Sequence, residues 1–446
     1  MCRTPLASCL VLVSCLGTFA CSSSDSAWSD DDVGSGSTTT SVGTGATGTT
    51  ATGTGTTSGT STSAAAAPTG AGGSPDVGLL TAADWDDNLN FELFQDFRAH
   101  ALANDPGKAT LDSGDRIVIK VVDEQGQPIP NAGVSVHQGG TTYLDAPTAS
   151  DGRVLFFPTH DGAGQAPGLT VTVSPPQAQP SVGVATVLAP QGSEWTFTLA
   201  GAQPILPPAL DLAFVIDATG SMGDEIEYLK AEVKGIVDNV YAEVGQVSLH
   251  LGLVVYRDVG DVYVTKTFDF TDSIATFQTA LAAQSADAGG DLPEAMDQAV
   301  EAMNELSWRS GNVARIAFVV ADAPPHAENG AAMLAGADAA RHMGVKIYPI
   351  AASGADAEAE YYLRLAAEAT LGRYLFLTDD SGIGGDHVEP HLPCYQVQHL
   401  NVLINRMIAS EMTGTRVPAD PSEVLRTVGD PVDNVCTLAD GTTAPF

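Results

Sequence analysis

Apolar and polar residues follow two different periods along the chain, and the change of period divides it. Between residues 110 and 203, short segments such as "RIVIKVVD" and "LTVTVSP" place an apolar side chain at every second position. From residue 207 onward, short apolar runs alternate with longer stretches whose apolar residues recur every three or four positions. We therefore predict an all-β region followed by a doubly wound α/β domain over residues 207–413.

The α/β region predicts strands at 210–216, 247–256, 262–270, 314–321, 345–352 and 373–378. Helices are expected between these strands. The stretch after Asp217 places Ile226, Leu229 and Val233 on one helical face. Pro293 suits the first position of another helix, because it needs no backbone N–H partner there.

The N-terminal part has no such pattern. Residues 1–21 resemble an export signal, with Cys21 as the candidate lipidated cysteine of a bacterial lipoprotein; plain secretion with cleavage nearby is the alternative. Residues 22–75 are rich in Ser, Thr and Gly and cannot bury a core, so we predict a disordered linker that tethers the rest. Residues 76–109 form a short connecting segment, and residues 414–446 form a C-terminal tail.

The charge balance excludes some classes of partner. The chain has 19 basic and 54 acidic residues, a formal net charge of −35. Such a chain is repelled by nucleic-acid backbones and by anionic membrane surfaces. It suits cations and basic proteins, although an acidic balance can also be only a solvated surface. No later segment is long and apolar enough to span a bilayer, so we expect membrane attachment only through an N-terminal lipid.

Two cysteines remain outside the signal and its cleavage site. Cys394 and Cys436 therefore predict a disulfide that fixes the C-terminal tail, because the chain is expected to be exported. Two free thiols are the alternative.

Five oxygen-bearing side chains stand where predicted strands meet helices. Asp217 ends the first strand, and Thr219 and Ser221 follow at alternate positions. Asp291 precedes the helix that begins at Pro293, and Asp322 ends the strand at 314–321. The carboxyl ends of parallel strands share one edge of a sheet, so these oxygens are expected to converge. They suit a hard divalent cation, Mg²⁺ first, with Ca²⁺ and Mn²⁺ as alternatives. Helix capping by Asp217 and Ser221 is the simpler reading.

The motifs "DATGSM", "GGDLPEA" and "ADAPPH" make the chain from 208 to 413 resemble a von Willebrand factor type A (VWA) domain of the hemicentin-like branch. The resemblance implies sheet order 3-2-1-4-5-6 with one antiparallel edge strand. It also implies a metal-ion-dependent adhesion site (MIDAS), with Asp217, Thr219 and Ser221 as direct ligands and Asp322 acting through water. Asp291 stands where the family usually has threonine, which adds negative charge and makes Ca²⁺ a realistic competitor.

The β region resembles a carboxypeptidase-regulatory-like or Ig-like β-sandwich, on the phrases "VVDEQGQPIPNAGVSV" and "TASDGRVLFF". That resemblance implies a spacer. The chain is thus expected to be a tethered extracytoplasmic adhesion protein, at the bacterial outer membrane or cell surface or else secreted. Its metal would engage a protein ligand through an Asp or Glu carboxylate.

We expect no enzymatic activity, because no general base, nucleophile elbow or phosphate loop accompanies the motif. A structural envelope protein with a purely stabilising metal and a metal-dependent hydrolase are the alternatives. A later acidic and histidine-containing stretch favours a solvated loop over a second metal site; it holds Asp379, Asp380, Asp386, His387, Glu389 and His391. His326 is likewise interpreted as a loop residue.

Overall fold

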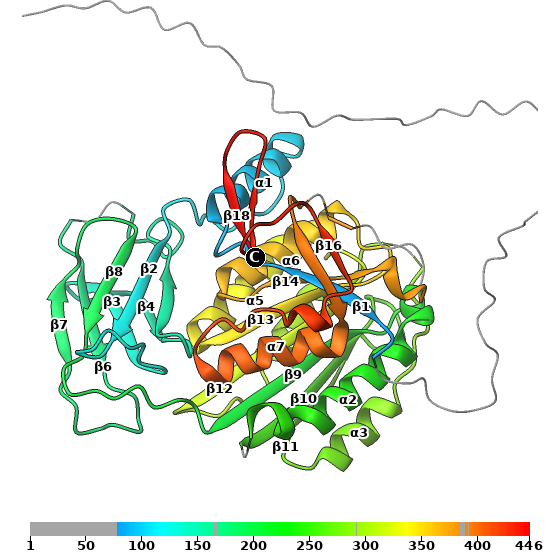
Figure 1. The fold of residues 1–446 in the computed structure, drawn as a ribbon, viewed down its shortest axis with the longest axis horizontal. Coiled ribbons are helices and arrows are strands. Elements are labelled where there is room, and N and C mark those ends of the chain that lie inside the picture. The colour runs from blue at the N-terminus through cyan, green and yellow to red at the C-terminus, as the bar shows by residue number, and fades with distance from the viewer. Residues whose placement is uncertain (1–77, 165–166, 246, 291, 384–388, 391) are drawn as a thin grey trace, which may run out of the picture. The chain divides into compact units, whose positions relative to one another are not determined.

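The structure is a computed structural model, and it describes residues 78–446 except 165–166, 246, 291, 384–388 and 391 (Figure 1). The predicted signal, Cys21, the linker and the candidate ligand Asp291 therefore lie outside the described residues. No helix in the described part is long and apolar enough to cross a membrane.

A nine-stranded sheet carries the α/β region. Its strands include β9 (Ala209–Asp217), β10 (Ser248–Tyr256), β11 (Thr265–Thr271), β12 (Val313–Ala321), β13 (Val345–Ala351) and β14 (Tyr374–Thr378). They lie in the order β11-β10-β9-β12-β13-β14, which is 3-2-1-4-5-6. All are parallel except β11, which pairs antiparallel with β10 at the edge. The predicted doubly wound fold is confirmed, and each strand begins and ends close to its predicted bounds.

Helices cover both faces of this sheet, which explains why its central strands read as unbroken apolar runs. Every residue of β9 and β12 is buried. On one face, Leu212 and Phe214 pack with α2 (Ile226–Val244), α3 (Ile274–Ala282) and α7 (Leu400–Thr413). On the other, Ala213 and Val215 pack with α4 (Met296–Asn304), α5 (Gly330–Met343) and α6 (Ala357–Ala369) (Figure 1).

The segment predicted as a connector contributes a strand to the same sheet. β1 (Thr81–Trp85) lies between β14 and β15 (Tyr395–His399), antiparallel to both, and α1 (Phe91–Asn104) follows it. All five residues of β1 are buried. β16 (Arg426–Val428) then pairs with β15 at the far edge. The sheet thus extends beyond the strands that the apolar runs predicted.

Between α1 and β9 the chain forms two small sheets around one hydrophobic core. One contains β2 (Ile117–Val122), β5 (Arg153–Phe156) and β8 (Glu194–Thr198). The other contains β3 (Gly133–Gln138), β4 (Thr141–Pro147), β6 (Thr170–Ser174) and β7 (Ala185–Leu188). Alternate residues of β2 are buried, as expected for a strand with one face on a core. The all-β region is therefore a β-sandwich.

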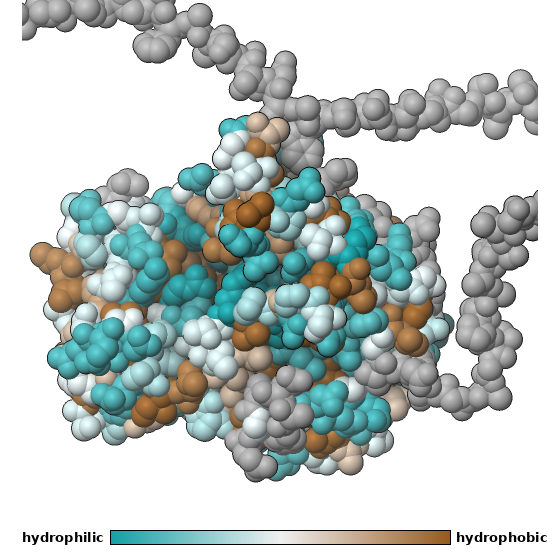
Figure 2. Space-filling model, viewed as in Figure 1, coloured by the Kyte–Doolittle hydropathy of each residue, from teal (hydrophilic) through white to brown (hydrophobic). Residues whose placement is uncertain are grey.

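The C-terminal tail is fixed to the α/β region by a covalent bond. Cys394 and Cys436 form a disulfide with an S–S distance of 2.04 Å. Cys436 lies in β17 (Val435–Thr437), which pairs with β18 (Thr443–Pro445). Both sulfurs pack with Trp85 of β1 in a small buried cluster. Elsewhere, hydrophilic residues cover much of the face seen in Figure 2, with hydrophobic ones in separate groups, in keeping with the net charge of −35.

Candidate metal centre

The turn after β9 gathers three of the predicted side chains. Asp217 is the last residue of the strand and, like Thr219, is fully buried. Its Oδ1 accepts hydrogen bonds from the Thr219 N–H at 2.9 Å and the Thr219 Oγ1 at 2.7 Å. Thr219 Oγ1 and Ser221 Oγ lie 3.0 Å apart. The alternate spacing of these residues does turn their oxygens toward one place.

A second loop lies directly against this turn, and glycines permit the contact. The Gly220 N–H donates to the Ala288 carbonyl at 2.9 Å, and a Cβ at Gly220 would stand only 2.6 Å from that oxygen. At Gly289, which has a φ of +66°, a Cβ would stand 3.0 Å from the Thr219 Cβ. The two glycines therefore let the loop before α4 approach the Asp217 turn closely.

Asp322, from a third loop, and Glu294, from the same loop as Gly289, lie beside this turn. Asp322 follows β12, which neighbours β9, and is 3% exposed. Ser221, Asp322 and Glu294 line one open cavity of about 390 Å³. The Glu294 N–H donates to the Pro324 carbonyl at 3.0 Å, so its backbone is held beside the loop that follows Asp322. Of the predicted residues, Asp217, Thr219, Ser221 and Asp322 come together, and Asp291 is not among the described residues.

Burial and neighbouring carboxylates raise the pKa values of Asp217 and Glu294. Burial, and then the charge of Asp322, raises the pKa of Asp217 to about 7. Burial, and then the charge of Asp217, raises the pKa of Glu294 to about 8. The Tyr256 phenol is buried beside them, and burial and the same carboxylates raise its pKa too. Several acidic groups thus share a poorly solvated space, and a cation there would offset their mutual repulsion.

The residues present fit a divalent metal ion. Asp217 Oδ2 and Glu294 Oε2 are buried and have no hydrogen-bond partner among the described residues. Buried carboxylate oxygens in that condition are costly unless an ion or a donor meets them. The side-chain donors named above are carboxylate and hydroxyl oxygens, which Mg²⁺ and Ca²⁺ prefer over softer ligands.

Comparison with known proteins agrees with this geometry. Residues 211–384 match the family model of the von Willebrand factor type A domain. The chain contains a VWA domain. The matched range holds Asp217, Thr219, Ser221 and Asp322, as well as Glu294 and Asp291.

Two curated relatives share part of the chain. An ariadne-like RING finger protein of Acanthamoeba polyphaga mimivirus is 34% identical over 122 residues, and the alpha-protein kinase vwkA of Dictyostelium discoideum is 29% identical over 119 residues. These matches span 27% and 26% of this chain, and only 12% and 19% of the relatives.

Matches among solved structures include BatB from Bacteroides thetaiotaomicron, at 14% identity and a TM-score of 0.33, covering 46% of this chain and 98% of that one. Proximal thread matrix protein 1 from the mussel byssus, solved with a zinc-occupied MIDAS motif, is 18% identical with a TM-score of 0.29; the match covers 37% of this chain and 41% of that one.

Two contacts beneath the VWA site were not predicted from the sequence. The Arg257 guanidinium is buried and donates to the carbonyls of Ala218 at 3.0 Å and Ser285 at 2.9 Å, joining two of the site loops. His326 Nε2 lies 2.6 Å from Asp258 Oδ1, and this hydrogen bond raises the pKa of His326. Asp258 lies in the motif "YRD" and His326 in "PPH", and only the fold brings these two side chains together.

Two other acidic clusters in the described part of the chain are already paired with arginine. Arg426 binds Asp380 at 2.8 Å and also binds Glu389, and their neighbours Asp386, His387 and His391 lie outside the described residues. Carboxylate and imidazole atoms of His160, Asp161 and Asp338 lie within 4.8 Å of one another, but Arg341 bonds to both aspartates. Arginine therefore already balances carboxylate charge in both groups.

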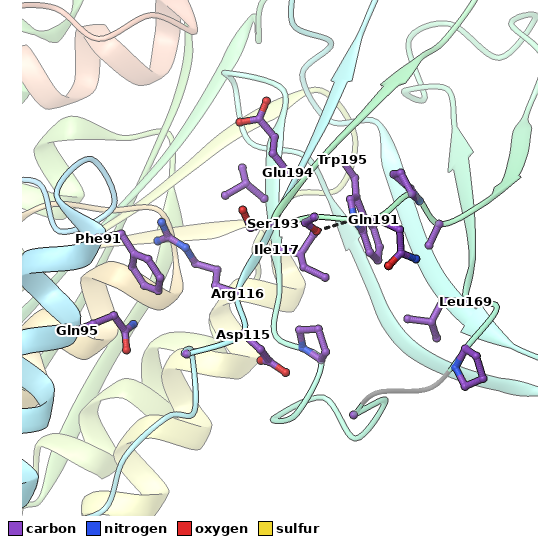
Figure 3. Close-up of a pocket in the computed structure, with 18 of the residues that line it drawn as sticks. Phe91, Gln95, Asp115, Arg116, Ile117, Leu169, Gln191, Ser193, Glu194 and Trp195 are labelled. Atoms are coloured by element: carbon purple, nitrogen blue, oxygen red, sulfur yellow. Dashed lines mark hydrogen bonds between the residues drawn. The ribbon is translucent and has the colours of Figure 1, made fainter. Parts of the chain in front are cut away.

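A hollow of about 1050 Å³ in the described residues is lined by residues other than those of the metal-site loops (Figure 3). It is lined by α1 and by segments of the β-sandwich around Trp195. Its guanidinium, Arg116, lies over the Phe91 ring and bonds to Asn88 at 2.7 Å and Glu368 at 3.1 Å. None of its lining residues carries the carboxylates described above.

Proposed function

We propose that this chain is a tethered extracytoplasmic binding protein whose VWA domain holds a divalent cation and engages a protein ligand through it. The ligands of the ion would be Asp217, Thr219, Ser221, Asp291 and Asp322. The buried Asp217 Oδ2, which lacks a hydrogen-bond partner among the described residues beside two hydroxyls and an open cavity, is the observation that carries the proposal.

A divalent ion held there would supply positive charge and could accept a further oxygen ligand. The chain's own residues supply the rest: Asp217 and Asp322 offset the charge, and the Thr219 and Ser221 hydroxyls offer neutral oxygens. Mg²⁺ is the proposed ion, with Ca²⁺ and Mn²⁺ as alternatives. An Asp or Glu carboxylate of a partner protein is the proposed ligand. The proposal includes no catalysis, because it assigns no group to activate water.

The remaining parts of the proposal rest on sequence patterns. Residues 1–21 would direct export, with lipid attachment at Cys21 of a bacterial cell-surface or outer-membrane protein, or secretion without it. Residues 22–75 would act as a flexible tether, and the β-sandwich, of the carboxypeptidase-regulatory-like or Ig-like kind, would serve as a spacer. The resemblance of "GGDLPEA" and "ADAPPH" to the hemicentin-like branch supports assigning the VWA domain to that branch.

The test compares Asp217→Ala with Asp430→Ala, which removes an exposed carboxylate from the C-terminal tail. Isothermal titration of the chelator-treated full chain with Mg²⁺ measures ion binding. Surface plasmon resonance over immobilised Asp- and Glu-containing peptides, with Mg²⁺ or with EDTA, measures ligand binding.

We expect Asp217→Ala to lose ion binding and peptide binding, and Asp430→Ala to keep both. Ion binding without any metal-dependent peptide binding would favour a stabilising metal instead. Equal ion binding by Asp217→Ala and the wild type would contradict the site itself.

A further inference from the structure

The strand β7 forms one edge of the β-sandwich. It is the last strand in the order β4-β3-β6-β7, and among the described segments it pairs only with β6 (Figure 1). The Ala189 N–H donates to the Leu169 carbonyl at 2.8 Å, so this residue of the ladder faces β6. Backbone groups of an antiparallel strand point alternately to its two sides, so those of Thr186 and Leu188 point away from β6. Two N–H and two C=O groups are thus available to a further strand.

The side chains of β7 are mostly apolar and exposed. Val187 pairs with Val171, which is fully buried in the core of the sandwich, yet Val187 itself is 43% exposed. Leu188 is 73% exposed, and Val184, just before the strand, is 60% exposed. The core is therefore incompletely covered on the side of β7, and a strand added there would remove apolar surface from water.

β7 also lacks the residues that usually keep an edge strand from pairing. Natural proteins protect such strands with charged side chains, lysine above all, or with proline. In the described part of the chain, the other edge strands of at least four residues each have a charged residue: Lys266 and Asp269 in β11, Asp145 in β4, Arg153 in β5 and Glu194 in β8. β7 contains neither charge nor proline, and residues 162–193 contain no charged residue at all.

The charge of the chain and the symmetry of the edge indicate what pairs with it. Two copies, each with a net charge of −35, repel one another, and the uncharged stretch 162–193 is where they can approach with least repulsion. Two identical strands in antiparallel pairing are related by a two-fold axis, as in a closed dimer. With Val187 of one copy opposite Val187 of the other, Thr186 of each copy faces Leu188 of the other. All the outward backbone groups of Thr186 and Leu188 are then paired.

We propose that β7 is a self-association surface, through which two copies of this chain join their four-stranded sheets into one continuous sheet. The partner is a second copy of the chain. This gives the β-sandwich a role in assembly in addition to that of a spacer, and it does not depend on a metal ion in the VWA domain.

Sedimentation velocity of the full chain at increasing micromolar concentrations measures self-association. EDTA is present throughout, so that a metal ion cannot link two copies. Leu188→Lys places a charge on the exposed edge, and Thr186→Pro removes an outward N–H while leaving the hydrogen bonds to β6 in place. Thr142→Lys is the matched control, because it adds the same charge at an exposed position of β4, the opposite edge of the same sheet.

Two further measurements complete the experiment. Far-ultraviolet circular dichroism confirms that each variant is folded. Hydrogen exchange at the amides of Thr186 and Leu188, at low and at high concentration, reports whether the edge is paired in the dimer. Because lysine lowers the net negative charge of the chain, greater overall repulsion cannot explain a loss of association in Leu188→Lys.

We expect the wild type to form dimers as its concentration rises, and the two amides to exchange more slowly as it does. Leu188→Lys and Thr186→Pro should weaken dimer formation at least tenfold. Thr142→Lys should change it less than twofold.

A wild type that stays monomeric would overturn the inference, as would equal effects of Leu188→Lys and Thr142→Lys. Dimer formation by Thr186→Pro at the wild-type level would show that the backbone of β7 is not used, with the same consequence. Amides protected equally at every concentration would show that another segment of the same chain covers the edge, and this would also overturn the inference.

Discussion

At the scale of single residues, the site depends on small side chains as much as on acidic ones. Asp217, Thr219, Ser221 and Asp322 could be predicted because strand ends in a parallel sheet share an edge. Glu294 could not, because its place follows from a backbone contact with Pro324 that no local pattern encodes. Sequence spacing reports which residues share an element, and contacts between two loops depend on the finished fold.

Gly220→Ala should weaken metal binding at least tenfold, because the new Cβ would stand 2.6 Å from the Ala288 carbonyl and separate the two loops. Gly223→Ala is the control, since a Cβ there would meet nothing within 4 Å. Isothermal titration with Mg²⁺ and Ca²⁺ measures both. Equal affinities for the two variants would show that the loop contact has no part in the site.

At the scale of elements, apolar runs predicted the six strands from β9 to β14 but not β1. "TAADW" has no run of large apolar residues, yet all of it is buried. Ion pairs contribute to holding this strand in the sheet: Asp84 binds Arg406 and lies 3.3 Å from Arg373. Burial raises the pKa of Asp84, but the charges of these arginines outweigh burial and lower it. A strand that is stabilised by arginines far away in the sequence cannot be predicted from its local pattern of apolar residues.

Asp84→Asn should lower the free energy of unfolding by about 3–5 kcal/mol, because it leaves buried arginine charge without its partner. Asp96→Asn, on an exposed position of α1, should change it by less than about 0.5 kcal/mol. Urea denaturation followed by tryptophan fluorescence measures both. A loss below about 1 kcal/mol for Asp84→Asn would contradict this role for β1.

The contact between α6 and the start of β2 predicts a pH dependence. Glu368 is fully buried 3.1 Å from Arg116; burial raises its pKa to about 7, and Arg116 opposes this only in part. The folded chain then holds a proton that the unfolded chain loses near its ordinary value of 4.5. The contribution of Glu368 to stability is present below about pH 4.5 and is lost as the pH rises to about 7.

Glu368→Gln should remove this part of the pH slope, as measured by urea denaturation at steps between pH 4.5 and 7.5. Parallel curves for the wild type and Glu368→Gln across that range would contradict the assignment.

At the scale of the whole molecule, the order of regions was predictable and their connections were not. The change of hydrophobic period separated the β-sandwich from the α/β region. In the chain, the sandwich lies between β1 and β9, two strands of one sheet. This could not be predicted, because β1, "TAADW", has few large apolar residues. The chain has 54 acidic and 19 basic residues. A bound cation would reduce the repulsion between acidic side chains where it binds.

We propose that acidic and hydroxyl groups from separate loops hold one divalent ion at the carboxyl ends of the strands. Isothermal titration of the chelator-treated full chain with Ca²⁺ and Mg²⁺, beside Asp217→Ala, tests it most directly. We expect about one ion bound per chain, and no binding by Asp217→Ala. A wild-type chain that binds neither ion, or an Asp217→Ala chain that binds as tightly as the wild type, would contradict it.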